Sequence, residues 1–545
     1  MSHVNLGIVL AAAILAISTA STPPHPLGSG VGKAMAAAKD AVKRYHEAAA
    51  ARGDGQAAWW LAEHSEGGES VRWLEVAANR GVPVAFGILA WRYEVGHDVT
   101  KDDAASLKWV TAGVKAGDTA SFEGMADRLR DGRGVRAALP EALALYAKVQ
   151  PDEDEEAISV LLAQGRPFAT FGDFLANLRS RSEAGDGTAS YALYTLTYER
   201  FGIPAGTLAD ALPYCVLAAE QGHAEAQNEL GNWYLQGADG ALVADRSKAF
   251  TWFLRASSKD YAPAMISLAH WWESAPGSGR DPDQVMKHLR AAAMTGDANA
   301  QIALAERLAT GMAPGQTDPV YPVDFAESLL LLRKAANQGH AQAMYFLALH
   351  LLDGRPFARD PGGAARWLEK AEGLGHTDAM GVLARLHEDG VGVERNLSRA
   401  FALNQKAGLR LRVGHAYRDG RGVAANPVLA LERFIDEAEA RVDEPAEVLP
   451  WLGMMFEAGQ GVARDESAAR ALYAASHTAA GEVLLARLEE SRPGATLQSR
   501  LEAYRDALSG LLGQAFQVPA DPARALGFYR KAVADYLERF EYEAQ

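Results

Sequence analysis

The chain has 545 residues, of which 48% are hydrophobic, and its formal net charge is −15 with a pI near 5.5. This acidity disfavours nonspecific binding to nucleic acid or to anionic membranes, because both require a basic surface. The lone cysteine, Cys215, leaves no partner for an internal disulfide and excludes a metal site built from cysteines.

An apolar run occupies residues 6–17. Its length is typical of the hydrophobic region of a signal peptide and is short for a transmembrane helix. Small residues at 18–20 offer cleavage after Ala20, although the usual basic flank is missing, since the first basic residue is Lys33. We therefore predict a signal peptide over residues 1–20 and a periplasmic or secreted chain. An uncleaved anchor and a buried N-terminal helix are the alternatives.

Residues 21–37 contain closely spaced prolines and glycines, which predict a flexible linker. Within this stretch, residues 28–33 resemble a phosphate-binding loop only superficially. The spacing is one residue short, and Ala34 stands where that loop needs Ser or Thr. We expect no nucleotide site here, and no transmembrane span in the mature chain.

From residue 38 onward, a pattern returns about every 36 residues. It consists of a glycine, a run of small residues and a Leu-Ala or Leu-Gly step, and its clearest copies begin at Gly222, Gly296, Gly339 and Gly375. A fixed period of this size indicates a repeat array, in which each unit buries its apolar face against its neighbours. Such an array predicts function on an extended surface.

The second half of each unit predicts another helix, because aromatic and small residues recur at helical spacing, as in Ala249, Trp252 and Ala256. A Gly-x-Gly-Val sequence separates the two helices in the best copies. We expect its first glycine to end the first helix in a left-handed conformation. The Asn or Asp that follows, such as Asn396 or Asp465, is expected to cap the second helix.

On these residues the chain resembles the Sel1-like repeat family, helical-hairpin relatives of the tetratricopeptide repeats. The resemblance implies an all-α, right-handed superhelical solenoid that serves as an adaptor or scaffold, with no reaction and no cofactor. We expect this solenoid over residues 38–545, with degenerate units near 151–184 and after 487. Exported members that brace each hairpin with a disulfide, including a subgroup linked to β-lactam hydrolysis, have cysteines that this chain lacks.

Catalytic and metal-binding patterns are missing from the sequence. His223, His340 and His376 recur after the glycine of separate units, so we expect them in separate layers, too distant to share a metal. Cys215 is expected to be a buried, unreactive residue. We predict no catalytic, cofactor-binding or metal site, and we expect the acidic run at 152–156 to be solvated.

Some first-helix positions are not needed to build the core, and these are our candidates for partner binding. We expect them to project into a groove lined by the first helices, although packing between neighbouring units or beneath a loop is an alternative for the tryptophans. The candidates are Trp91, Arg92, Trp233, Trp271, Arg307, His350 and His415.

The function that we predict is an exported scaffold that binds proteins or peptides in the cell envelope. Two alternatives remain open at this stage. One is a periplasmic scaffold of polysaccharide secretion, and the other is a cell-envelope hydrolase related to the β-lactamase-like subgroup.

Overall fold

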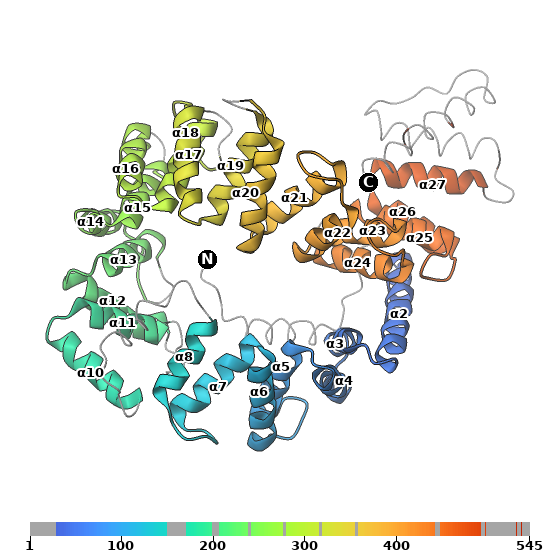
Figure 1. Ribbon diagram of the computed structural model, residues 1–545, viewed down its shortest axis with the longest axis horizontal. Coiled ribbons are helices and arrows are strands. Elements are labelled where there is room, and N and C mark those ends of the chain that lie inside the picture. Colours follow the sequence, from blue (N-terminus) through green and yellow to red (C-terminus); the bar gives the residue numbers. More distant parts are fainter. Residues whose placement is uncertain are drawn as a thin grey trace. The chain divides into compact units, whose positions relative to one another are not determined.

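The computed structural model describes residues 29–149, 171–198, 207–237, 241–275, 279–315, 319–354, 358–441 and 447–491, with three single residues nearer the C-terminus. This part of the chain contains 25 helices and no strand, with an isolated β-bridge between Met312 and Pro319 (Figure 1). The all-α prediction is therefore confirmed. Among these helices, none has the length and apolar character needed to cross a bilayer. The predicted signal peptide lies outside the described residues.

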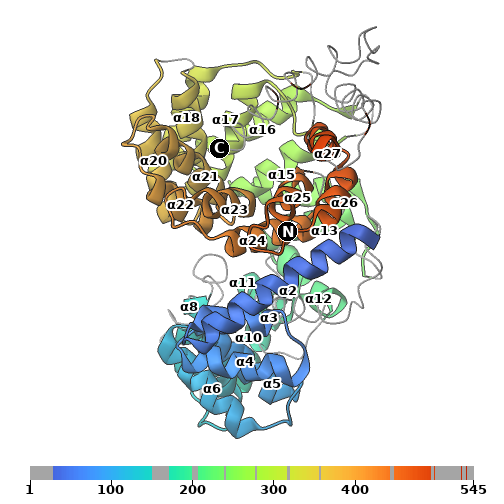
Figure 2. The same ribbon diagram turned by 90° about the vertical axis from the view of Figure 1, so that its right-hand side faces the viewer.

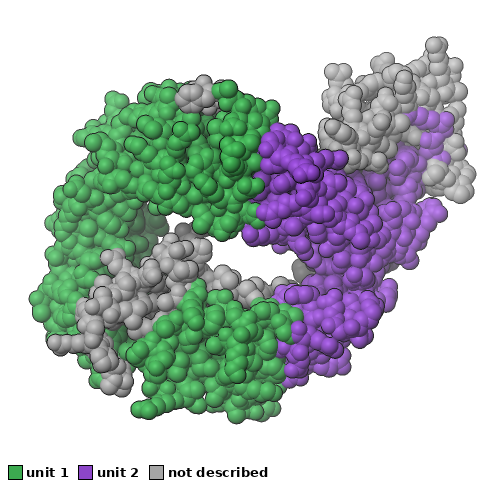
Figure 3. Space-filling view, in the orientation of Figure 1, with its two compact units in different colours: residues 1–9, 81–375 green, residues 10–80, 376–545 purple. Residues whose placement is uncertain are grey.

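The described residues form two compact units (Figure 3). Unit 1 runs from Gly81 to Gly375, whereas unit 2 combines the segment that ends at Arg80 with the segment that begins at His376. Unit 2 is therefore discontinuous in sequence.

Unit 1 is a stack of helical hairpins. One helix, α10 (Phe171–Glu183), stands before the last five pairs. The hairpins are α5 (Pro83–Val95) with α6 (Asp103–Ala116), α7 (Thr119–Asp131) with α8 (Leu139–Val149), α11 (Gly187–Tyr198) with α12 (Leu208–Glu220), α13 (Ala224–Gln236) with α14 (Arg246–Ser257), α15 (Ala262–Glu273) with α16 (Pro282–Met294), α17 (Ala298–Thr310) with α18 (Phe325–Asn337), and α19 (Ala341–Asp353) with α20 (Pro361–Gly373).

Unit 2 begins with a long helix, α2 (Ser29–Ala51). The remaining helices are α3 (Gly55–Glu63), α4 (Gly67–Asn79), α21 (Thr377–Asp389), α22 (Leu397–Lys406), α23 (Arg410–Asp419), α24 (Pro427–Ala440), α25 (Leu449–Ala458), α26 (Glu466–Ser476) and α27 (Ala479–Ser491). Since α2 already begins at Ser29, residues 29–37 are helical, and the expectation of a flexible linker is wrong for them. Val31, Ala34 and Met35 explain the difference, because they pack into the core of this unit.

The connector between the two helices of a hairpin follows the predicted chemistry. Gly420 ends α23 in the left-handed region with φ of 70°, and the Asn426 side chain accepts the N–H groups of the first turn of α24. The second connector glycine, Gly422, also has positive φ, at 73°. A Cβ added there would lie 2.1 Å from the carbonyl oxygen of Leu397, at the start of α22. This close approach lets neighbouring hairpins stack.

The three recurrent histidines stand at the N-caps of first helices. His223 and His376 each use Nδ1 to accept a backbone N–H of the first helical turn, at 3.4 and 3.2 Å, and His340 is the N-cap of α19. Asp297 fills the same role in α17. Their recurrence therefore has a structural cause in helix capping.

The core of several hairpins contains a pair of residues with matched volumes, one on each helix. Gly231 on α13 faces Phe253 on α14 so closely that a Cβ on the glycine would lie 2.4 Å from the ring. Gly453 and Tyr473 repeat this arrangement, also at 2.4 Å. In three hairpins the first helix carries alanine instead, and the equivalent second-helix position carries leucine. The alanine pairs are Ala269 with Leu289, Ala305 with Leu332, and Ala348 with Leu368.

The aromatic residue that marks the second helix in the sequence lies beside this core position. Phe253 is fully buried, whereas the preceding Trp252 is half-buried at the edge of the core. Leu368 and Trp367 repeat the arrangement. Trp252 packs against the cluster that contains Tyr194 and Leu230, whereas Phe253 belongs to the next cluster along the stack.

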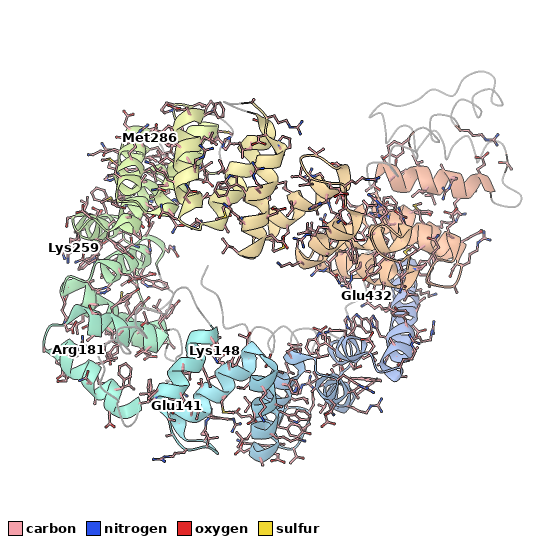
Figure 4. All side chains as sticks on the ribbon, in the orientation of Figure 1. Glu141, Lys148, Arg181, Lys259, Met286 and Glu432 are labelled. Carbon is pink, nitrogen blue, oxygen red and sulfur yellow. The ribbon has the colours of Figure 1, made fainter. Side chains whose placement is uncertain are left out.

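Helix α2 packs against α24 and α26, far along the chain, as both ribbon views show (Figures 1 and 2). Their shared core includes Val42 of α2 and Phe434 of α24. The His46 ring nitrogen Nε2 lies 2.7 Å from a carboxylate oxygen of Glu432, with both side chains buried, and Figure 4 marks Glu432 beside α2. At one end of this contact, the Asn426 amide donates to the Tyr45 hydroxyl at 2.9 Å.

Candidate protein-interaction surface

The first helices of consecutive hairpins form one side of unit 1. Helix α13 contacts α15, and α15 contacts α17, whereas α14, α16 and α18 do not approach one another as closely. Because the stack is tighter on the first-helix side, that side is the concave one. Figure 1 shows α13 on the inner side of the stack and α14 on the outer side. We call the surface made by α11, α13, α15, α17 and α19 the first-helix face.

Charge is distributed unequally between the two sides of these five hairpins. The first helices contain five carboxylates and one arginine, which gives a formal charge of −4. The second helices, α12 to α20, contain nine Lys or Arg and six Asp or Glu, which gives +3. The first-helix charges are Glu225, Glu229, Glu273, Glu306, Asp353 and Arg307. The first-helix face is therefore acidic and favours a basic partner.

Two of the seven predicted partner-binding residues are buried, and the expectation that they project into a groove is corrected. The Arg92 side chain is 4% exposed and donates to Asp98 at 3.0 Å, so it braces the end of α5. His415, in unit 2, packs between Phe434 and Trp451. Burial and nearby arginines lower the pKa of His415 to about 3. Both side chains are interior residues in this conformation.

Trp271 packs against the preceding hairpin. Its indole N–H donates to the Arg246 carbonyl at 3.0 Å, and its ring lies 4.6 Å from that of Phe250. The Arg246 guanidinium covers the ring at 4.8 Å. Trp271 is half-buried, so it contributes to packing between units and still borders the surface.

Arg307 of α17 is held by the preceding first helix. It donates to Glu273 at 2.9 Å, and the Tyr321 hydroxyl donates to the same carboxylate at 2.6 Å. Trp91 and His350 are half-buried, with rings near His97 and Phe325. The partner-binding role of Trp91, Trp233, Trp271, Arg307 and His350 stays a prediction.

Trp233 belongs to an aromatic cluster that joins α11 to α13. Its indole N–H donates to the Tyr194 hydroxyl at 3.0 Å, and its ring meets Tyr198 edge to face at 5.7 Å. Tyr194 and Tyr198 stack at 5.8 Å with nearly parallel rings. Tyr191, one turn earlier, stacks on His223 at 4.6 Å. We call Tyr191, Tyr194, Tyr198 and Trp233 the aromatic cluster.

Glu229 lies near this aromatic cluster, close enough for its charge to act on Tyr191 and Tyr194. Burial raises the pKa of its carboxyl group, and a hydrogen bond from the Asn232 side chain opposes that rise. In turn, burial and then the nearby Glu225 and Glu229 carboxylates raise the pKa of the Tyr191 hydroxyl. The first-helix face thus holds a carboxyl group in a partly desolvated aromatic environment.

Sequence reasoning missed Tyr191 and Glu229. The spacing of Glu229 and Trp233, four residues apart on one helix face, was available in the sequence. The hydrogen bond between Tyr194 and Trp233 could not be read from the sequence, because it depends on how two hairpins stack.

Cys215 is fully buried, as predicted, in the same core cluster as Tyr194. Burial raises the pKa of its thiol to about 12, so the reactive thiolate is disfavoured. Across the described residues, no group of three or more His, Cys, Asp or Glu side chains is arranged to hold a metal ion.

A protein-family model described as Sel1 repeat matches this chain in eight segments. They are residues 88–118, 224–261, 298–340, 341–376, 377–410, 410–432, 451–476 and 503–535. The matches cover hairpins of both units.

Several curated proteins are similar in sequence. Chitin synthase regulatory factor 3 of Schizosaccharomyces pombe is 24% identical over 325 residues, which cover 58% of this chain and 29% of that protein. The chitin synthase regulator SKT5 of Saccharomyces cerevisiae is 26% identical over 182 residues, covering 32% and 25%. An uncharacterised protein of Neisseria meningitidis serogroup B is 29% identical over 321 residues, covering 56% and 61%. The chain therefore spans less than two thirds of the length of each.

Two solved structures are similar in fold. A protective antigen of uropathogenic Escherichia coli is 20% identical with a TM-score of 0.46, and the match covers 87% of this chain and 96% of the antigen. A Sel1 repeat protein from Oxalobacter formigenes is 26% identical with a TM-score of 0.43, covering 57% and 90%.

Proposed function

Because the chain belongs to the Sel1 repeat family, we propose that it is a scaffold that binds partner proteins through the first-helix face of unit 1. The observation that carries this proposal is the combination of half-exposed tryptophans and surplus carboxylates on that concave side. Tryptophan is among the residues that dominate binding energy at protein interfaces. A concave repeat surface also offers an extended area to a partner.

The names of two relatives support a protein partner. Both are named for regulating chitin synthase, and a regulator in this sense acts on another protein. They also favour a more specific candidate, in which the partner takes part in polysaccharide synthesis or secretion. The place of action that we propose is the cell envelope, on the strength of the apolar N-terminal run.

Affinity capture from the native envelope fraction tests this proposal, with the full chain as bait. We expect a stoichiometric protein partner whose capture falls at least about tenfold with Trp233→Ala, since interface tryptophans carry large shares of binding energy. Trp252→Ala is the matched control, because Trp252 is also half-buried but lies on a second helix. Circular dichroism verifies that both variants fold.

Equal capture by wild type and Trp233→Ala contradicts the first-helix face. For the location, N-terminal sequencing of the mature protein is expected to begin near Ser21. Full-length chain in the cytosolic fraction contradicts an envelope role.

A further inference from the structure

Tryptophan rings in this protein are usually covered by its own cations. Six of them have a Lys or Arg group between 4.1 and 5.1 Å from the ring centroid. These six are Trp73, Trp109, Trp252, Trp271, Trp367 and Trp451. Among the described residues, no cation covers Trp233 in this way.

Trp233 is nevertheless held in place. Its indole N–H is fixed by Tyr194, and the edge contact with Tyr198 limits rotation of the ring. The side chain is half-buried, so part of it faces solvent on the concave side of unit 1. A fixed, partly exposed indole is a preorganised surface for a cation.

Glu229 supplies the charge beside this ring. It lies one helical turn before Trp233 on the same face of α13. Asn232 donates a hydrogen bond to its carboxyl group, but within the described part of the chain no Lys or Arg forms an ion pair with it. Helices α11 and α13 carry no Lys or Arg at all. A partly buried carboxylate without a cation gains most from one supplied by a ligand.

We propose that Glu229 and Trp233 form a recognition site for a Lys or Arg side chain of a partner protein. The cation would lie against the Trp233 ring and donate hydrogen bonds to the Glu229 carboxylate. This inference rests on the proposed scaffold function and specifies the chemistry of its partner. The formal charge of −4 on the first helices favours the same basic occupant. Arginine fits best, because its planar guanidinium stacks on a ring and pairs with a carboxylate.

A peptide selection tests the site without knowledge of the natural partner. The probe is a random library of peptides of about twelve residues, selected on the full chain. We expect selected peptides to share an arginine or lysine, and their affinity to fall at least about tenfold with Glu229→Gln. Glu306→Gln is the matched control, since Glu306 is also a first-helix carboxyl but already pairs with Arg307.

A double-mutant cycle then assigns the contact. The shared arginine is replaced by citrulline, a neutral group of similar shape, and binding to wild type should weaken by the same factor as in Glu229→Gln. The replacement should weaken binding to Glu229→Gln little further, because the two changes remove one interaction. Thermal melts verify that the variant is folded.

Additive losses in the cycle, or a selection that yields no basic peptides, overturn the cation site. The partner-capture experiment distinguishes failure of the cation site from failure of the scaffold proposal. Capture that is lost with Trp233→Ala but unchanged with Glu229→Gln leaves the scaffold standing and removes the cation site. Absence of any captured partner contradicts the scaffold, whereas the peptide cycle still decides the chemistry of the site.

Discussion

At the scale of single residues, several hairpins match the volumes of two core residues, one on each helix. A glycine on the first helix accompanies Phe or Tyr on the second in pairs such as Gly231 with Phe253, and in three other hairpins an alanine accompanies Leu. Interiors are packed so densely that one additional methyl group is felt. Comparing the hairpins of this chain therefore shows which side-chain sizes fit together in the core.

Gly231→Ala tests this compensation. The new methyl group would collide with Phe253 at 2.4 Å, so we expect a net loss of about 1 to 3 kcal/mol in the free energy of unfolding. Adding Phe253→Leu should recover most of the loss, because it recreates the Ala305–Leu332 combination. Urea unfolding of the two single variants and the double variant measures the coupling. Losses that simply add would contradict direct packing.

His415 gives a second prediction at this scale. Its pKa is about 3 in the folded chain, against an ordinary value of 6.5 for histidine, so below pH 6.5 the unfolded chain binds more protons. The stability that the neutral ring contributes is therefore present above pH 6.5 and lost as the pH falls toward 3.

With His415→Leu this dependence disappears. The stability of wild type relative to the variant should fall by about 2 kcal/mol between pH 7 and pH 5. Hydrogen exchange of the α25 amides measures the free energy of unfolding of wild type and variant at pH 7 and at pH 5. A difference that stays constant with pH would show that the ring is protonated as readily in the folded state.

At the scale of elements, α2 is the helix whose role differs most from expectation. It completes the core formed by α24 and α26, with Val42 only 1% exposed. Without α2, the apolar residues of those two helices would face water. The helix therefore acts as a structural part of hairpins that lie almost four hundred residues later.

Val42→Asp should open this contact. A buried, unpaired carboxylate costs at least about 3 kcal/mol, so amide protection in α24 and α26 is expected to fall. Protection in α13 and α15 should not change, because those helices belong to unit 1. Lys43→Ala is the control on the same helix, since Lys43 is exposed and forms a surface ion pair with Glu69. Unchanged protection in α24 and α26 would mean that α2 is dispensable.

At the scale of the whole molecule, the sequence predicts the features that are determined within one hairpin. Connector glycines such as Gly420 and caps such as Asn426 act within one hairpin, so their pattern predicts the helices and their ends. The predicted surface was less accurate, because Trp91 and Arg92 are adjacent on a helix and differ by about 100° in direction. The period alone does not say which of them points inward. No short sequence pattern predicts the contact between His46 and Glu432, because the two residues are far apart in the chain.

That contact also has a consequence for the time course of biosynthesis. His46 and Glu432 are separated by 386 positions in the chain. At about 5 to 20 residues per second, a ribosome needs roughly 20 to 80 s to make the second residue after the first. During this interval α2 can pack against α3 but lacks its later partners α24 and α26, although the hairpins of unit 1 can already form one after another. We therefore expect part of the apolar surface of α2 to need protection from aggregation until α24 and α26 have been translated.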